Sequence, residues 1–129
     1  MPWDPRKAHL DQIKFANQKI NTLVKSLLSY NSNSIIIIQG DTGSYFENSY
    51  GSSSNKVVIE RMSNLNAIYM PKNSYDSFKE ISTPVNTFRI IMNEIFDENY
   101  EILPDKMYWS DSNSPYLHED VTKLLQDTM

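Results

Sequence analysis

The sequence predicts an α/β protein in which a small sheet of three or four strands is packed by helices. Two long segments repeat apolar residues with helical spacing, and a run of four isoleucines, Ile35–Ile38, follows the first of them. Shorter apolar segments lie between and after the helices, so the order is helix, strand, loop, strand, helix, strand, helix, which is typical of α/β folds. At 129 residues the chain fits a single domain, residues 1–129.

The first helix is expected to begin at Pro5, because Asp4 followed by proline is a common helix start. It ends before Asn31, where a cluster of Asn and Ser residues breaks the pattern. Its apolar positions are Leu10, Ile13, Ile20, Leu23, Val24, Leu27 and Leu28. The isoleucine run that follows suits a strand buried on both faces. Residues 43–56 are rich in Gly, Ser, Asn and Tyr and are expected to form a flexible loop, either a lid or a connection without a role.

The middle of the chain predicts short elements. Residues 57–60 suit either a short strand or a helical turn, and residues 65–70 alternate well enough to form a strand that Pro71 stops. Residues 74–78 are expected to form a short helical turn.

A second long helix is expected after Thr83, which precedes Pro84 as an N-cap precedes a first-turn proline. One apolar face of this helix is formed by Val85, Phe88, Ile91, Met92, Ile95 and Phe96. Residues 106–109 predict an edge strand, and Ser114-Pro115 predicts the start of a last helix. That helix would carry Leu117, Val121, Leu124 and Leu125.

Asp41 is the first candidate for chemistry, because it follows the isoleucine strand between Gly40 and Gly43. Residues just past the carboxyl end of a buried strand face the crevice in which α/β proteins bind ligands. The alternative is structural, since an aspartate beside glycines often caps a turn with its own side chain. A metal site here would need a second carboxylate, for which Glu47 and Glu60 are the candidates.

Composition excludes several classes of function. The net charge is −4, and Lys and Arg are scattered, which argues against nucleic acid and anionic membranes as partners. There is no cysteine, so disulfides and thiolate metal sites are excluded. No segment approaches the ~20 apolar residues of a membrane span, and no signal peptide is recognisable, so a cytoplasmic location is expected. His9 and His118 stand without a motif around them and are expected to be ordinary surface residues.

Four segments carry a resemblance to a known family: residues 35–44, 64–71, 82–89 and 103–109. In this order they resemble the C-terminal part of sulfatase-like hydrolases, members of the alkaline phosphatase superfamily. In that family the corresponding strand ends in Asp-His-Gly, whose aspartate and histidine bind the catalytic metal. Asp41 and Gly43 match this motif, whereas Thr42 replaces the histidine.

The resemblance implies the C-terminal portion of an alkaline phosphatase-like fold. It makes Asp41 a metal ligand and Thr42 a weak ligand or a substrate contact, with weak binding of Mn²⁺ or Zn²⁺, because a threonine hydroxyl is a poorer ligand than imidazole. The family's nucleophile and its other acidic ligands belong to an N-terminal portion that this sequence does not contain. A fragment that hydrolyses no sulfate or phosphate ester alone is therefore expected, with the missing portion as its partner. Members of the family are often membrane-anchored or exported.

Two other functions stay open. An interaction or structural module that self-associates is one, because the open edges of a small sheet invite a second chain. Such a module predicts a homo-oligomer. The other is a retroviral-type aspartic protease, because Asp41-Thr42-Gly43-Ser44 contains the Asp-Thr-Gly signature; that alternative predicts a nearly all-β chain working as a dimer.

Overall fold

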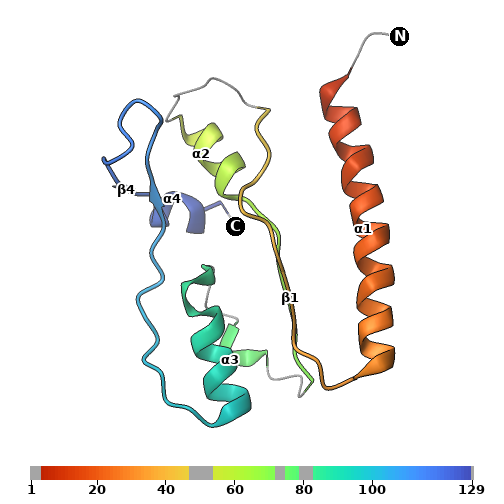
Figure 1. The fold of residues 1–129 in the computed structure, drawn as a ribbon. Coiled ribbons are helices and arrows are strands. Elements are labelled where there is room, and N and C mark those ends of the chain that lie inside the picture. The colour runs from red at the N-terminus through yellow and green to blue at the C-terminus, as the bar shows by residue number, and fades with distance from the viewer. Residues whose placement is uncertain (1–3, 47–53, 72–74, 79–82, 129) are drawn as a thin grey trace. The chain divides into compact units, whose positions relative to one another are not determined.

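The computed structural model describes residues 4–46, 54–71, 75–78 and 83–128, and it confirms an α/β protein (Figure 1). The elements follow in the order α1 (Pro5–Tyr30), β1 (Ile36–Gln39), α2 (Asn55–Met62), β2 (Asn66–Tyr69), η1 (Asp76–Phe78), η2 (Pro84–Asn86), α3 (Thr87–Phe96), β3 (Tyr108–Trp109), β4 (Glu119–Asp120) and α4 (Thr122–Gln126). The chain divides into two compact units, Met1–Ile37 with Ile68–Asn73 and Ile38–Ala67 with Ser74–Met129.

Helix α1 occupies the predicted range. The Asp4 carboxylate accepts hydrogen bonds from the N–H groups of Arg6 (3.0 Å) and Lys7 (3.2 Å), and Pro5 fills the first helical position. At the other end the Asn31 N–H donates to the Leu27 carbonyl, and the chain leaves the helix. No residue of α1 is buried, so its apolar stripe is at best partly covered.

The described strands form two separate two-stranded antiparallel sheets, so the predicted single sheet of three or four strands is wrong. β1 pairs with β2, and just beyond the strand ends the Gly40 N–H donates to the Leu65 carbonyl at 2.8 Å. The isoleucines of β1 are half-buried rather than buried on both faces. β3 does not join this pair, because it finds its partner in β4, with Tyr108 opposite Asp120.

A small hydrophobic core lies between α2, α4 and the residues around β3. Its buried members are Val58, Met107, Val121 and Leu125, with Ile59, Met62, Trp109 and Leu124 packed against them. Residues 57–60, for which the sequence left a strand or a helical turn open, lie within α2 and are helical. Helix and sheet both contribute to this core, which is small for a chain of this length.

The predicted last helix is wrong in its first half. The Asp111 carboxylate accepts from the N–H groups of Asn113 and Ser114, and this Asx-type turn leads into β4 instead of a helix. Only residues from Thr122 onward are helical, and Leu117 stays exposed.

Two asparagines hold the chain that returns after α3. The buried Asn86 side chain donates to the Leu103 carbonyl and accepts from the Leu103 N–H, both at 2.9 Å. Asn93 forms the same pair of hydrogen bonds with the Tyr100 backbone, at 2.9 and 2.7 Å. The Thr83 N–H and hydroxyl both donate to the Asp105 carboxylate. Residues 100–105, here called the return segment, are thus held at three points beside η2 and α3.

The predicted apolar face of the second long helix is divided. Of the predicted face Ile91 is buried, whereas Val85 is 47% exposed, Phe88 66% and Phe96 58%; Ile90, which the prediction did not include, is buried as well. Buried Asn86, hydrogen-bonded to the Leu103 backbone, and buried Thr87 occupy the inner side, which leaves part of the apolar face outside.

Replacing Asn86 with alanine is predicted to destabilise the protein more than the same change at Asn93. Asn86→Ala leaves the Leu103 N–H and carbonyl without partners in a buried place, at a cost of about 1–3 kcal/mol for each unsatisfied group. The Asn93 bonds are exposed, so water can replace them and the loss should stay near ~1 kcal/mol. Urea unfolding of both variants measures the difference, and equal losses would contradict a special role for Asn86.

Candidate functional site

The candidate site is a tight turn after β1, here called the Asp41 turn and comprising residues 40–46. Its backbone is fixed against the end of α2 and the segment that follows. Besides the Gly40 N–H bond to Leu65, the Gly43 N–H donates to the Arg61 carbonyl at 2.7 Å. The Asn64 side chain donates to the Gly40 carbonyl at 3.0 Å. Both ends of the Gly40–Gly43 stretch are therefore anchored to the same segment.

Gly43 is required by close approach of two backbones. A Cβ atom built at this position would lie 2.0 Å from the Glu60 carbonyl oxygen and 2.7 Å from that of Ser63. A methyl group there cannot be accommodated without moving the end of α2. Gly40 is different, because its Cβ would meet no atom closer than 3.5 Å.

Side chains from α2 hold the remainder of the turn. The Glu60 carboxylate accepts from the Ser44 hydroxyl at 2.7 Å and from the Phe46 N–H at 2.6 Å. The Arg61 guanidinium donates to the Gly43 carbonyl at 3.2 Å and lies 5.2 Å from the centre of the Tyr45 ring, within cation–π range. Tyr45 and Phe46 are half-buried, so they pack back onto the protein, as aromatic loop residues commonly do.

This anchored turn presents Asp41 and Thr42 outward, and both residues are exposed. Glu60, one candidate for a second carboxylate, is engaged with Ser44 and Phe46 through Oε1, and Glu47 lies outside the described residues. Across the parts of the chain that the structure describes, no three His, Asp or Glu side chains are grouped closely enough to hold a metal ion. Asp41 and Thr42 alone do not fit a metal site, which needs three or four ligands.

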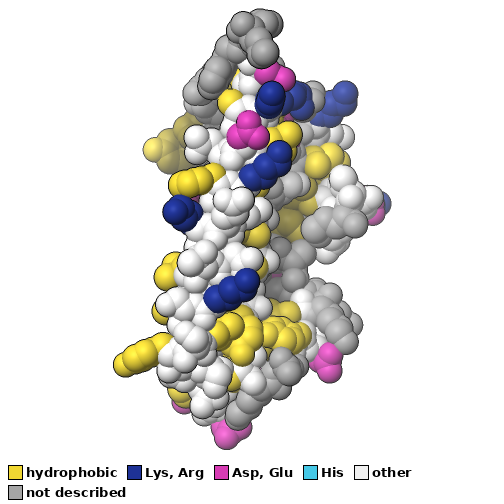
Figure 2. Space-filling model, turned by 90° about the vertical axis from the view of Figure 1, so that its right-hand side faces the viewer, with side chains coloured by type: hydrophobic (Ala, Val, Ile, Leu, Met, Phe, Trp, Pro, Cys, Tyr) yellow, Lys and Arg dark blue, Asp and Glu magenta, His cyan; other side chains and the backbone are white. Residues whose placement is uncertain are grey.

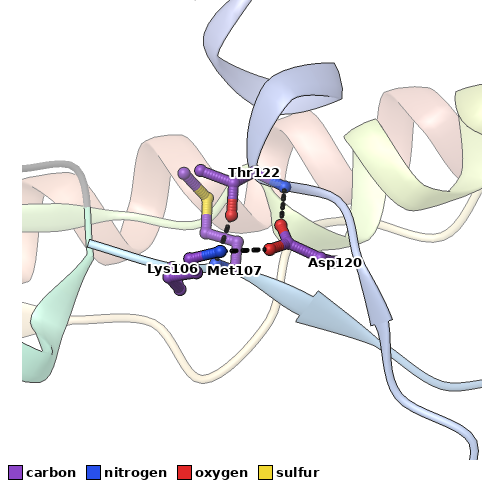
Figure 3. Close-up of polar contacts among 4 residues, drawn as sticks. All are labelled: Lys106, Met107, Asp120 and Thr122. Carbon is purple, nitrogen blue, oxygen red and sulfur yellow. Dashed lines mark hydrogen bonds and ion pairs between the residues drawn. The ribbon is translucent and has the colours of Figure 1, made fainter. Parts of the chain in front are cut away.

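A second polar cluster, which was not predicted from the sequence, joins the two residues before β3 to β4 and α4 (Figure 3). The Lys106 ammonium lies 2.8 Å from the Asp120 carboxylate, which also accepts from the Thr122 N–H at 3.1 Å. The Thr122 hydroxyl accepts from the Met107 N–H at 2.9 Å. These hydrogen bonds from Lys106 and Thr122 lower the pKa of Asp120 to about 2. The cluster closes the ends of the small sheet, and no local sequence pattern links Lys106 to a partner so distant along the chain.

Searches against protein-family models, characterised proteins and solved structures found no match to this chain. The resemblance to sulfatase-like hydrolases thus stays a prediction. Among the described helices, none has the length and apolar character needed to cross a membrane. The helices are at odds with the aspartic-protease alternative, which required a nearly all-β chain.

Gly43→Ala is predicted to destabilise the protein, whereas Gly40→Ala should be tolerated. The first substitution forces backbone atoms apart, at a cost of about 1–3 kcal/mol or more. The second meets only ordinary contacts and should change stability by less than ~1 kcal/mol in either direction. Urea unfolding gives the two energies, and amide chemical shifts of residues 60–65 should move only for Gly43→Ala. Similar behaviour of the two variants would contradict the close approach.

The Lys106–Asp120 contact is predicted to make stability depend on pH in the acid range. Because the pKa of Asp120 is lowered from 3.8 to about 2, its stabilising effect is present above pH ~4 and is lost as the pH falls towards 2. Asp120→Asn should therefore reduce stability at neutral pH and flatten the dependence between pH 4 and 2. Unfolding by urea at a series of pH values measures this, with the exposed Asp127→Asn as control. A wild-type slope in the Asp120→Asn variant would contradict the prediction.

Proposed function

We propose that this chain is the C-terminal part of a sulfatase-like hydrolase and is not catalytic by itself. The observation that carries the proposal is the Asp41 turn: an exposed carboxylate just past a strand, on a backbone anchored at Gly40 and Gly43. A ligand must be held in a fixed position to bind a metal ion well, and an anchored turn does this.

The contacts between the resembling segments give further support. Residues 40–43 hydrogen-bond to residues 61–65, which joins the end of the first resembling segment to the start of the second. Thr83 and Asn86 of the third segment bind Asp105 and Leu103 of the fourth. These hydrogen bonds join the first resembling segment to the second and the third to the fourth.

The proposed activity is hydrolysis of a sulfate or phosphate ester, completed by a separate portion that supplies the nucleophile and the remaining ligands. In such a site Asp41 would be one ligand among several, and Thr42 would contact the substrate or serve as a weak ligand. The alternative is a non-catalytic interaction module, which the exposed apolar side chains of α1 and α3 favour. Because the chain is proposed to be inactive alone, turnover of nitrophenyl sulfate or phosphate only together with an N-terminal portion, abolished by chelator and by Asp41→Ala, would favour the enzyme.

Restoring the family's histidine is predicted to strengthen metal binding. Thr42→His places an imidazole beside the Asp41 carboxylate, and imidazole is a far better ligand for Zn²⁺ or Mn²⁺ than a hydroxyl. We expect at least ~10-fold tighter Zn²⁺ binding than in the wild type, measured by isothermal titration calorimetry. The gain should vanish in the Asp41→Asn/Thr42→His double variant.

The control is a histidine placed elsewhere on the described surface, at Ser29 of α1, where no carboxylate-bearing turn precedes it. If Thr42→His binds neither metal more tightly than Ser29→His does, the Asp41 turn is not the remnant of a metal site and the proposal fails.

A further inference from the structure

An apolar hollow, here called the α3 hollow, is bounded by η2, α3 and the start of the return segment. It has a volume of 280 Å³, and its described lining residues are Val85, Phe88, Arg89, Met92 and Tyr100. Val85, Phe88 and Met92 follow helical spacing, and Arg89 lies four residues after Val85 and three before Met92. All five residues belong to one compact unit, Ile38–Ala67 with Ser74–Met129, so these walls are formed within a single unit.

Hydrogen bonds tie the walls of the α3 hollow to each other. The Asn93 side chain binds both backbone groups of Tyr100, at 2.9 and 2.7 Å, which holds Tyr100 beside α3. The Asn86 side chain binds both backbone groups of Leu103 at 2.9 Å, three residues further along the return segment. Because its walls are already joined, the hollow needs little ordering when a ligand enters, and this favours binding.

Arg89 is the one charged residue among the described residues that line the α3 hollow, and it is half-buried. The residues three and four positions away from it are Val85, Asn86, Met92 and Asn93, so the helix itself supplies no carboxylate at these spacings. Within the part of the chain that the structure describes, Arg89 forms neither a hydrogen bond nor an ion pair. The hollow thus offers an unneutralised guanidinium beside apolar side chains.

We propose that the α3 hollow binds a small apolar carboxylate of the medium-chain fatty acid class. Arg89 would pair with the carboxylate, since a guanidinium matches a carboxylate with two parallel hydrogen bonds. Val85, Phe88 and Met92 would contact the hydrocarbon chain. Small-molecule sites combine an apolar lining with a few polar groups in this way, and the volume of 280 Å³ is near the lower end of their usual ~300–1,000 Å³. This inference does not depend on the proposed hydrolase.

Other charged groups of the chain also act on an anionic ligand. Asp97, Glu98 and Glu101 are close to Tyr100 in the sequence and repel an anion, but all three are exposed, so water and salt screen them more than an Arg89 in direct contact. Figure 2 shows dark-blue Lys and Arg side chains spaced along α1, with yellow hydrophobic side chains beside them. Because a basic helix attracts anions without any pocket, lysine variants of α1 serve as controls.

Octanoate, octanol and acetate test the two parts of the proposed site separately. Titration of the full chain with each compound, followed by backbone amide chemical shifts, gives both the dissociation constant and the place of binding. Octanoate should bind with a dissociation constant of about 0.1–1 mM and shift the amides of residues 85–92 and 100. Octanol lacks the charge and acetate lacks the chain, so each should bind at least ~10-fold more weakly.

Variants of the hollow and of α1 locate the site. Arg89→Gln should weaken octanoate binding at least ~10-fold and leave octanol binding unchanged, whereas Arg89→Lys keeps the charge and should retain part of the affinity. Phe88→Ala removes a side chain that is 66% exposed and should weaken the binding of both compounds. The control, Lys14→Gln with Lys25→Gln on α1, should change neither. Far-UV circular dichroism should show unchanged helix content in every variant.

Three results would overturn the proposal: no octanoate binding at up to ~10 mM, octanol binding as tight as octanoate binding, or an Arg89→Gln variant that binds octanoate like the wild type. Loss of octanoate binding in the α1 control but not in Arg89→Gln would assign the anion to α1 and would equally overturn it. Amide shifts of residues 85–92 that grow with protein concentration and that octanoate does not reverse would show that a second copy fills the hollow, which also contradicts the proposal.

Discussion

The close approach of Gly43 to the end of α2 is the constraint on which the candidate site depends. The Gly43 N–H reaches the Arg61 carbonyl at 2.7 Å only because no side chain separates the two backbones. That contact, with the Gly40 bonds to Leu65 and Asn64, turns the chain away from β1 and leaves Asp41 outside. Glu60 and Arg61 can then hold residues 43–46 from the same helical turn. A larger residue at 43 would displace all of these groups at once.

Polar side chains, rather than a large core, organise much of the body. Asn86 and Asn93 each bind both backbone groups of one residue on the return segment, and Thr83 binds Asp105. The hydrophobic core of α2, β3 and α4 is small, so such hydrogen bonds position segments that apolar burial alone would leave undefined. α3 is attached through these hydrogen bonds and through its buried side, so its exposed apolar side chains are not needed to hold it in place.

Capping residues and prolines in the sequence predicted where several helices and strands begin or end. Asp4-Pro5 marked the start of α1, Thr83-Pro84 marked the start of η2 and α3, and Pro71 marked the end of β2. The pairing of β3 with β4 was not predictable in this way, because it depends on contacts such as Lys106–Asp120 between distant residues. The place of Asp41 after a strand predicted that it faces a crevice, and the structure shows an exposed residue on an anchored turn. The structural role of Glu60 was not predictable, because its partners are 14 and 16 residues away.

Net charge was the least informative quantity in the sequence, and the reason is physical. Electrostatic attraction depends on where charges lie, because interactions between exposed charges fade beyond a Debye length of about 10 Å. Residues 1–30 carry +3 and residues 31–129 carry −7, so at short range the two parts act as regions of opposite sign. The exposed apolar residues of α1 and α3 thus lie on parts of the chain that carry opposite net charge.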